Sequence, residues 1–96
     1  MQNFKSQTEM KELNDFFFYS ALLEECHRID AAAEKAGYFY VWSVQYYGWH
    51  VDLISLLYRN ENHNDAVERY VGDANERQMI TDHLKKVWAV IGGGAE

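Results

Sequence analysis

The first spacing that could carry chemistry is Glu24-x-x-His27, which places a carboxylate and an imidazole on one face of a helix. Di-metal carboxylate proteins use this spacing, but they need a second copy of it and two further glutamates from other helices. The residues three and four positions before His83 are Ile80 and Met79, so that histidine does not supply a second copy. The pattern therefore predicts a polar helix edge, with no metal site and no bound cofactor.

A second group, His50, Asp52 and Ser43, combines the three side-chain types of a hydrolytic triad. On a single strand, His50 and Asp52 would be neighbours about 6–7 Å apart, and no cleft would lie between them to hold a substrate. Together with Gln45, these residues are better suited to form a small polar patch that contacts a partner protein.

Cys26 is the only cysteine, and it lies on the apolar side of a helix between Leu22 and Ile29, where we expect an inert, buried thiol. The chain contains no G-x-S-x-G, P-loop, dinucleotide-binding or C-x-x-C motif. We therefore predict that the protein is not an enzyme. The alternative is a small metal- or ligand-binding enzyme subunit, which would have to use Glu24, His27, His50 and Asp52.

The elements that position these residues begin with a long helix, predicted over about residues 7–36. Ser6 and Glu9 fit a capping box at its start, and Gly37 is placed to end it as a left-handed C-cap residue. Such a helix would be on the order of 45 Å long, so a break near Asn14-Asp15 is an alternative. Its apolar positions form two stripes, one through Leu13, Phe16, Phe17, Ser20, Leu23 and His27, the other through Leu22, Cys26, Ile29, Ala33 and Ala36.

Residues 38–59 are rich in Val, Tyr, Phe and Trp, and they predict a β-hairpin in which Tyr47-Gly48 is a two-residue turn with positive φ at Gly48. The inner pairs would be Tyr46–Trp49, Val44–Val51, Trp42–Leu53 and Tyr40–Ser55. The outer pairs would be Gln45–His50, Ser43–Asp52, Val41–Ile54 and Phe39–Leu56. Seven of these eight pairs match polar with polar or apolar with apolar. A buried helix over the same residues remains the alternative, because apolar residues also recur there at helical spacing.

The rest of the chain predicts two further helices. After a loop at Asn60 to Asp65, the motif Asp-Ala-x-Glu-Arg occurs at residues 65–69 and again at residues 73–77. Each copy is typical of a helix start, with Asp as the N-cap and Glu three residues later. We predict a short helix over about 66–71 and a C-terminal helix over about 74–91.

The predicted fold class is therefore α+β, with a long N-terminal helix, a β-hairpin, a short helix and a C-terminal helix. The alternative is an all-α bundle in which residues 38–59 form a buried helix. The length suits a single domain over residues 1–96, with flexible ends at about 1–5 and 92–96.

Charge narrows the class of partner. The formal net charge is −6, and residues 9–34 carry a local net charge of −5. The acids in that segment are Glu9, Glu12, Asp15, Glu24, Glu25, Asp30 and Glu34, against Lys11 and Arg28. No Lys or Arg lies between Lys35 and Arg59, so the aromatic hairpin lacks the cations that hold phosphates in nucleic-acid platforms. We expect a protein partner with a basic surface and no nucleic acid.

Compartment follows from three simpler observations. A single cysteine permits no intrachain disulfide bond, which favours a reducing compartment. The first residues lack the apolar segment of a signal peptide. The longest apolar run, Phe16 to Leu23, is shorter than the roughly 20 residues that span a bilayer. We expect a soluble cytoplasmic protein that does not bind membranes.

The sequence thus predicts a non-enzymatic, small acidic protein-binding module: an inhibitor, an immunity-type protein or a phage-encoded antagonist that occludes a basic partner. The predicted partner-binding residues are Glu9, Glu12, Asp15, Gln45, Tyr47, Trp49, His50 and Asp52. An overlapping hypothesis is a homodimer whose interface contains Phe39, Val41, Ile54 and Leu56, because these outward-facing residues would otherwise expose apolar surface. The pattern leaves open whether the acidic helix or the hairpin face meets the partner.

Overall fold

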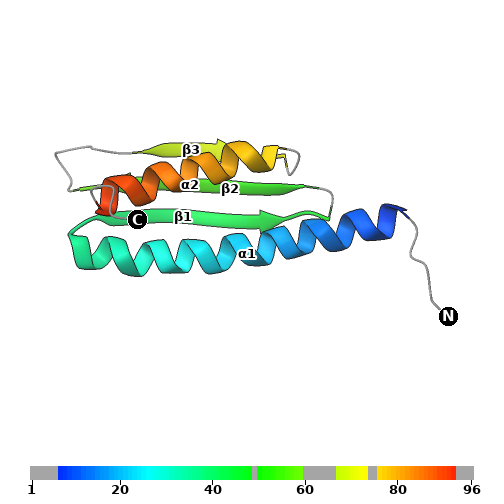
Figure 1. Ribbon diagram of the computed structural model, residues 1–96, viewed down its shortest axis with the longest axis horizontal. Coiled ribbons are helices and arrows are strands. Elements are labelled where there is room, and N and C mark those ends of the chain that lie inside the picture. The colour runs from blue at the N-terminus through cyan, green and yellow to red at the C-terminus, as the bar shows by residue number, and fades with distance from the viewer. Residues whose placement is uncertain (1–6, 49, 60–66, 74–75, 93–96) are drawn as a thin grey trace.

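The structure is a computed structural model that describes residues 7–48, 50–59, 67–73 and 76–92, with the side chains of residues 7–14 left out. Its elements, in chain order, are α1 (Gln7–Ala36), β1 (Phe39–Tyr46), β2 (Val51–Tyr58), β3 (Glu68–Val71) and α2 (Arg77–Gly92). The strands form one antiparallel sheet in the order β1-β2-β3 (Figure 1). The predicted α+β class is confirmed, and the all-α alternative is wrong because residues 39–46 and 51–58 are paired strands.

Helix α1 runs without the break that the sequence allowed near Asn14-Asp15. It ends as predicted at Gly37, which has a φ of 87°. The amide of Tyr38 donates to the carbonyl of Ala33 at 2.8 Å, and the amide of Gly37 donates to the carbonyl of Glu34 at 3.2 Å. These two bonds are those of a Schellman motif, which reverses the chain so that β1 runs back along the helix. The capping box predicted at Ser6 lies outside the described residues.

Strands β1 and β2 form the predicted hairpin, but the predicted register is wrong by two residues. Tyr46 lies opposite Val51 in the ladder, where the sequence predicted Trp49 as its partner. Every other pair is displaced by the same amount. Because side chains alternate with a period of two, this displacement leaves each side chain on its predicted face of the sheet.

The turn of the hairpin accounts for the displacement. The amide of Tyr47 donates to the carbonyl of His50 at 3.0 Å, so the reversal takes place between these two residues. Gly48 has the predicted positive φ, 92°. The sequence predicted Tyr47 and Gly48 as the two turn residues, whereas in the structure Tyr47 is the last residue before the turn and Gly48 is the first residue within it. A glycine can occupy either central position of a tight turn, so its presence alone does not select the register.

Strand β3 occupies residues that the sequence assigned to a short helix over about 66–71, and that prediction is wrong. β3 pairs with β2, and the buried side chain of Val71 lies opposite Leu53. Pairing gives hydrogen-bond partners to the edge of β2 that a hairpin alone would leave open. This long-range pairing and the burial of Val71 override the local helix-start signal. The loop predicted at 60–65 lies outside the described residues.

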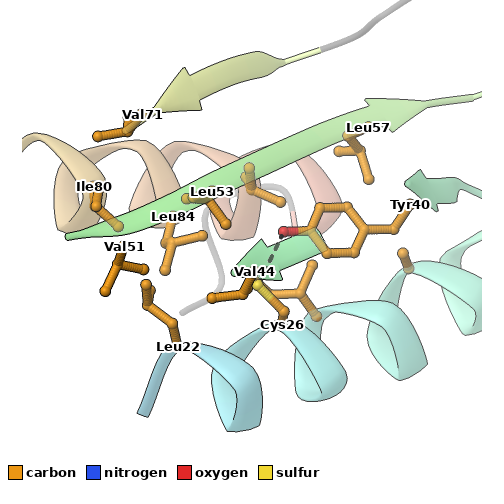
Figure 2. Packing of buried hydrophobic residues seen from close by; sticks show 13 residues of the cluster. Leu22, Cys26, Tyr40, Val44, Val51, Leu53, Leu57, Val71, Ile80 and Leu84 are labelled. Carbon is orange, nitrogen blue, oxygen red and sulfur yellow. Dashed lines mark hydrogen bonds between the residues drawn. The ribbon is translucent and has the colours of Figure 1, made fainter. Parts of the chain in front are cut away.

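Both helices pack on one face of the sheet and enclose the core (Figure 1, Figure 2). The core consists of Leu22, Cys26, Ile29 and Ala33 of α1, Tyr40 and Val44 of β1, Val51, Leu53 and Leu57 of β2, Val71 of β3, and Ile80, Leu84 and Val87 of α2. Of the two apolar stripes predicted on α1, the one through Cys26 is therefore the buried one. Phe17, on the other stripe, is 61% exposed.

Helix α2 begins slightly later than predicted. The amide of Glu76 donates to the carbonyl of Asp73 at 2.9 Å, and regular helix starts at Arg77. The predicted apolar stripe holds, since Ile80, Leu84 and Val87 are buried. Among the described residues, no helix combines the length and apolar character required to cross a membrane.

Candidate protein-binding face

The sheet face opposite the helices is not covered by any described element. We call it the open face. Its residues are Phe39, Val41, Ser43 and Gln45 of β1, Asp52, Ile54, Leu56 and Tyr58 of β2, and Glu68 and Tyr70 of β3. Alternation along each strand places them on this side, while the intervening residues enter the core.

Apolar side chains on the open face lie next to one another across the strands. Phe39, Val41 and Tyr70 are 62%, 51% and 66% exposed. Val41 lies opposite Leu56, and Ile54 lies opposite Tyr70, so the apolar surface continues from β1 to β3. Residues directly opposite in an antiparallel pair have neighbouring side chains, so these residues form a continuous patch. A patch of this kind on a folded chain typically marks an interaction site.

Polar side chains gather at the turn end of the same face, in a group that we call the polar cluster: Gln45, Tyr47, His50, Asp52 and Tyr70. Nε2 of His50 is 3.7 Å from Oδ1 of Asp52, and the hydroxyl of Tyr70 donates to Oδ2 at 3.5 Å. The rings of Tyr47 and His50 are 4.8 Å apart, and the Tyr47 hydroxyl donates to Oε1 of Gln45. Three strands thus converge to orient hydrogen-bonding groups beside the apolar patch.

Gly72 allows this cluster to form. A Cβ atom at Gly72 would lie 2.6 Å from Oδ1 of Asp52, closer than real Cβ contacts. A side chain at this position would therefore have to displace the Asp52 carboxylate from its place between His50 and Tyr70.

The charges of the open face have one sign. Asp52 and Glu68 lie on it, and none of its residues is a lysine or an arginine. The formal net charge of the whole chain, −6, adds to this local field. A face that pairs aromatic side chains with carboxylates is complementary to a basic surface.

The chain was compared with models of protein families, with curated proteins and with solved structures, and none of them matches.

The structure separates the predicted partner-binding residues into three groups. Gln45, Tyr47, His50 and Asp52 come together in the polar cluster. Glu9, Glu12 and Trp49 lie among the residues whose side chains the structure does not describe. Asp15 is only 1% exposed and forms an ion pair with Arg77, so it does not present its carboxylate to a partner. The four predicted dimer residues, Phe39, Val41, Ile54 and Leu56, all lie on the open face.

The four residues of the alternative metal or enzyme site, Glu24, His27, His50 and Asp52, do not come together in the structure. Glu24 and His27 lie on α1, where His27 packs edge-on against the ring of Trp42, at a centroid distance of 4.9 Å. His50 and Asp52 lie at the hairpin tip, on the opposite face of the sheet. Within the described part of the chain, no three His, Cys, Asp or Glu side chains are grouped so that they could hold a metal ion.

Cys26 is a core residue with no exposed surface. Burial is the main cause that raises the pKa of its thiol to about 11, although a hydrogen bond from Tyr40 acts in the opposite direction. The thiol is therefore protonated at neutral pH and does not act as a nucleophile.

Sequence reasoning missed the contribution of β3 to the open face. Glu68 and Tyr70 were assigned to a helix, and Tyr58 was not included among the outward-facing residues. A signal was present in Arg69-Tyr70-Val71, because aromatic and β-branched neighbours favour a strand over a helix. Asp65 and Glu68, just before these residues, favoured a helix because they fit the pattern of a helix start.

Proposed function

We propose that the protein is a non-enzymatic binding module that captures a protein partner on the open face of its sheet. The observation that carries this proposal is the continuous apolar patch of Val41, Leu56, Ile54 and Tyr70, which no described element covers. A second layer of structure normally covers such a face, and a partner protein can supply it.

The composition of the face agrees with what is known of protein interfaces. Tyrosine and phenylalanine are enriched at interface centres, and polar groups at the rim fix the orientation of the partner. On the open face, Phe39 and Tyr70 are the large exposed side chains, and the polar cluster lies at one end. Binding here needs no catalytic group, and it acts by covering the surface of the partner.

The sign of the charge supports a basic partner. Asp52 and Glu68 would lie at the edge of the apolar contact, where carboxylates steer a basic protein and lose little hydration. A module of this type acts as an inhibitor, in the way that an acidic immunity protein or antagonist occludes a basic enzyme. The lack of Lys and Arg on the face disfavours nucleic acid as the ligand.

The proposal is tested by affinity capture from the host with three variants of the tagged chain beside the wild type. Val41→Arg places a cation and a long side chain in the apolar patch, and we expect it to lose the partner. The double variant Asp52→Asn/Glu68→Gln should retain the partner only at low salt. It lacks two carboxylates that attract a basic partner, and added salt screens the attraction that remains. Phe17→Ala is the control, since Phe17 is an exposed apolar residue of α1, at 61% exposure against 51% for Val41.

A protein that binds the wild type and Phe17→Ala but not Val41→Arg supports the proposal. Equal capture by all forms, or loss with Phe17→Ala, contradicts the assignment of the open face. Light scattering separates the remaining possibility: a wild type that is dimeric and a Val41→Arg variant that is monomeric would mean that a second copy of the chain, not another protein, occupies the face.

A further inference from the structure

A pocket between β3 and α2, on the helix side of the sheet, contains buried polar atoms that the binding proposal does not use. Its volume is about 290 Å³, and Arg69, His83 and Lys86 are among the residues that line it. His83 is only 6% exposed, and its Nε2 has no hydrogen-bond partner among the described residues. The same holds for Nε of Arg69. Buried polar atoms are nearly always paired, so two in one pocket indicate a site for a polar ligand.

The ring of His83 is held in one orientation. A hydrogen bond to the backbone of Ser55, which lies opposite Arg69 in the ladder, is the smallest of the causes that act on the pKa of His83, and it raises that pKa. A bond that raises this pKa favours the protonated ring, so the ring is the donor in it. Because Nε2 is the unpaired nitrogen, we infer that Nδ1 carries the proton and that Nε2 of the neutral ring is an acceptor. Burial, followed by the positive charges of Arg69 and Lys86, lowers the pKa of His83 to about 4. Nε2 therefore requires a donor at neutral pH.

The two cations of the pocket are available to an anion. Arg69 donates to Sδ of Met79 at 3.6 Å, and within the described residues no carboxylate pairs with Arg69 or Lys86. Arg69 projects to the helix side of the sheet, the side on which Val71 is buried, so its guanidinium faces α2. Both cations lower the pKa of His83, and both line the same pocket as its ring.

Two carboxylates also line the pocket, and neither removes its positive character. Glu68 alternates with Arg69 along β3, so its side chain belongs to the open face. Asp82 is exposed and accepts a hydrogen bond from Nε2 of Gln78 at 3.0 Å. Two cations against one nearby carboxylate leave a net positive site.

We propose that this pocket binds hydrogen phosphate, with Arg69 and Lys86 donating to its charged oxygens and its hydroxyl group donating to Nε2 of His83. Hydrogen phosphate supplies both requirements at once, because it is an anion that keeps a proton at neutral pH. Water can donate to Nε2, but it brings no negative charge to the two cations. Sulfate has the same shape and charge but no proton to donate, so it provides a sharp comparison.

The test is a titration of the isotope-labelled full chain with phosphate and with sulfate at neutral pH and matched ionic strength, followed by NMR of the His83 ring and the Arg69 Nε–H group. We expect saturable binding of phosphate and at least about tenfold weaker binding of sulfate. Sulfate has no proton to donate, so it cannot make the hydrogen bond to Nε2 of His83. Arg69→Gln and Lys86→Gln should each weaken phosphate binding by about tenfold. Lys85→Gln is the matched control, because Lys85 is the adjacent lysine and lines a different groove, between α1 and α2.

Three results would overturn the proposal: no saturable response to phosphate, equal affinity for sulfate, or equal losses with Lys85→Gln and Lys86→Gln. If Arg69→Gln disturbs β3, Lys86→Gln decides the test by itself, because it changes an exposed residue and should leave the fold intact. Circular dichroism of each variant checks this. The binding proposal for the open face is independent, because none of these lysine or arginine residues lies on that face.

Discussion

The carboxylate of Asp15 in α1 forms an ion pair with the guanidinium of Arg77 at the start of α2. Asp15 is 1% exposed, and Arg77 also lies over the ring of Phe18 at 4.8 Å from its centroid. The pair therefore fastens the first residues of α2 to the long helix, and it shields the carboxylate from solvent. Its role is structural, although the sequence suggested a surface contact for Asp15.

We expect Arg77→Met to lower the free energy of unfolding by about 2–4 kcal/mol, because it removes a cation that pairs with a buried carboxylate. Adding Asp15→Asn to that variant should restore part of the loss. The measurement is urea unfolding of the wild type, both single variants and the double variant. Arg28→Met is the control: Arg28 is exposed and pairs with Glu25 on the surface, so its loss should change stability by less than about 1 kcal/mol. Equal effects of Arg77→Met and Arg28→Met would contradict a buried structural pair.

Local chemistry in the sequence was enough to predict α1, its cap and the two faces of the hairpin. The cap depends on Gly37 and its immediate neighbours, and the faces depend on a two-residue alternation. The register could not be predicted in this way, since a displacement of two residues leaves the same side chains on the same face. Gly48 is compatible with both turns.

Apart from the register, the features that the sequence did not predict depend on distant partners. Asp15 and Arg77 are 62 residues apart, and nothing local to Asp15 indicates its burial. β3 exists because β2 offers an edge to pair with, whereas its own residues carry a helix-start pattern. The pocket that contains Arg69 and His83 follows from the same pairing, because a helix at that position would have placed Arg69 elsewhere.

The core contains one hydrogen bond between side chains that can be tested directly. The hydroxyls of Tyr40 and Ser55 are 2.6 Å apart, and Ser55 has no exposed surface. The Tyr40 hydroxyl also points to the sulfur of Cys26 (Figure 2). Ser55→Ala should lower the free energy of unfolding by about 1–2 kcal/mol, because the Tyr40 hydroxyl keeps only the weak contact with Cys26 Sγ at 3.7 Å. Ser43→Ala, on the open face, should change it by less than about 0.5 kcal/mol. Chemical denaturation distinguishes the two, and similar losses would argue against the core hydrogen bond.

Cys26 provides a test of the packing of the core. Its thiol has no exposed surface, and burial raises its pKa to about 11. We expect a thiol reagent at mildly basic pH to label the folded chain at least about a hundredfold more slowly than the chain in urea, because reaction requires an opening that exposes the thiolate. Rapid labelling of the folded protein, at a rate close to that in urea, would mean that the core around Cys26 is open.

His83 predicts a pH dependence with a definite sign. Burial, Arg69 and Lys86 lower its pKa from 6.5 to about 4, so the unfolded chain binds a proton at pH values where the folded chain does not. Its contribution to stability is complete above pH 6.5 and is lost as the pH falls towards 4, by up to about 3 kcal/mol. Unfolding of the wild type and His83→Gln in phosphate-free buffer isolates this contribution. The stability difference between them should shrink over that range, and a constant difference would contradict the buried, neutral ring.

The central claim, that the open face binds another protein, is tested most directly by photo-crosslinking in the host. A benzophenone amino acid is introduced at Val41 on the open face, and in a parallel form at Phe17 on α1, which is similarly exposed. We expect the form labelled at position 41 to give one discrete adduct with a different, basic protein, and the form labelled at position 17 to give none. An adduct of twice the chain mass of 11.3 kDa, or no adduct specific to position 41, would contradict the claim.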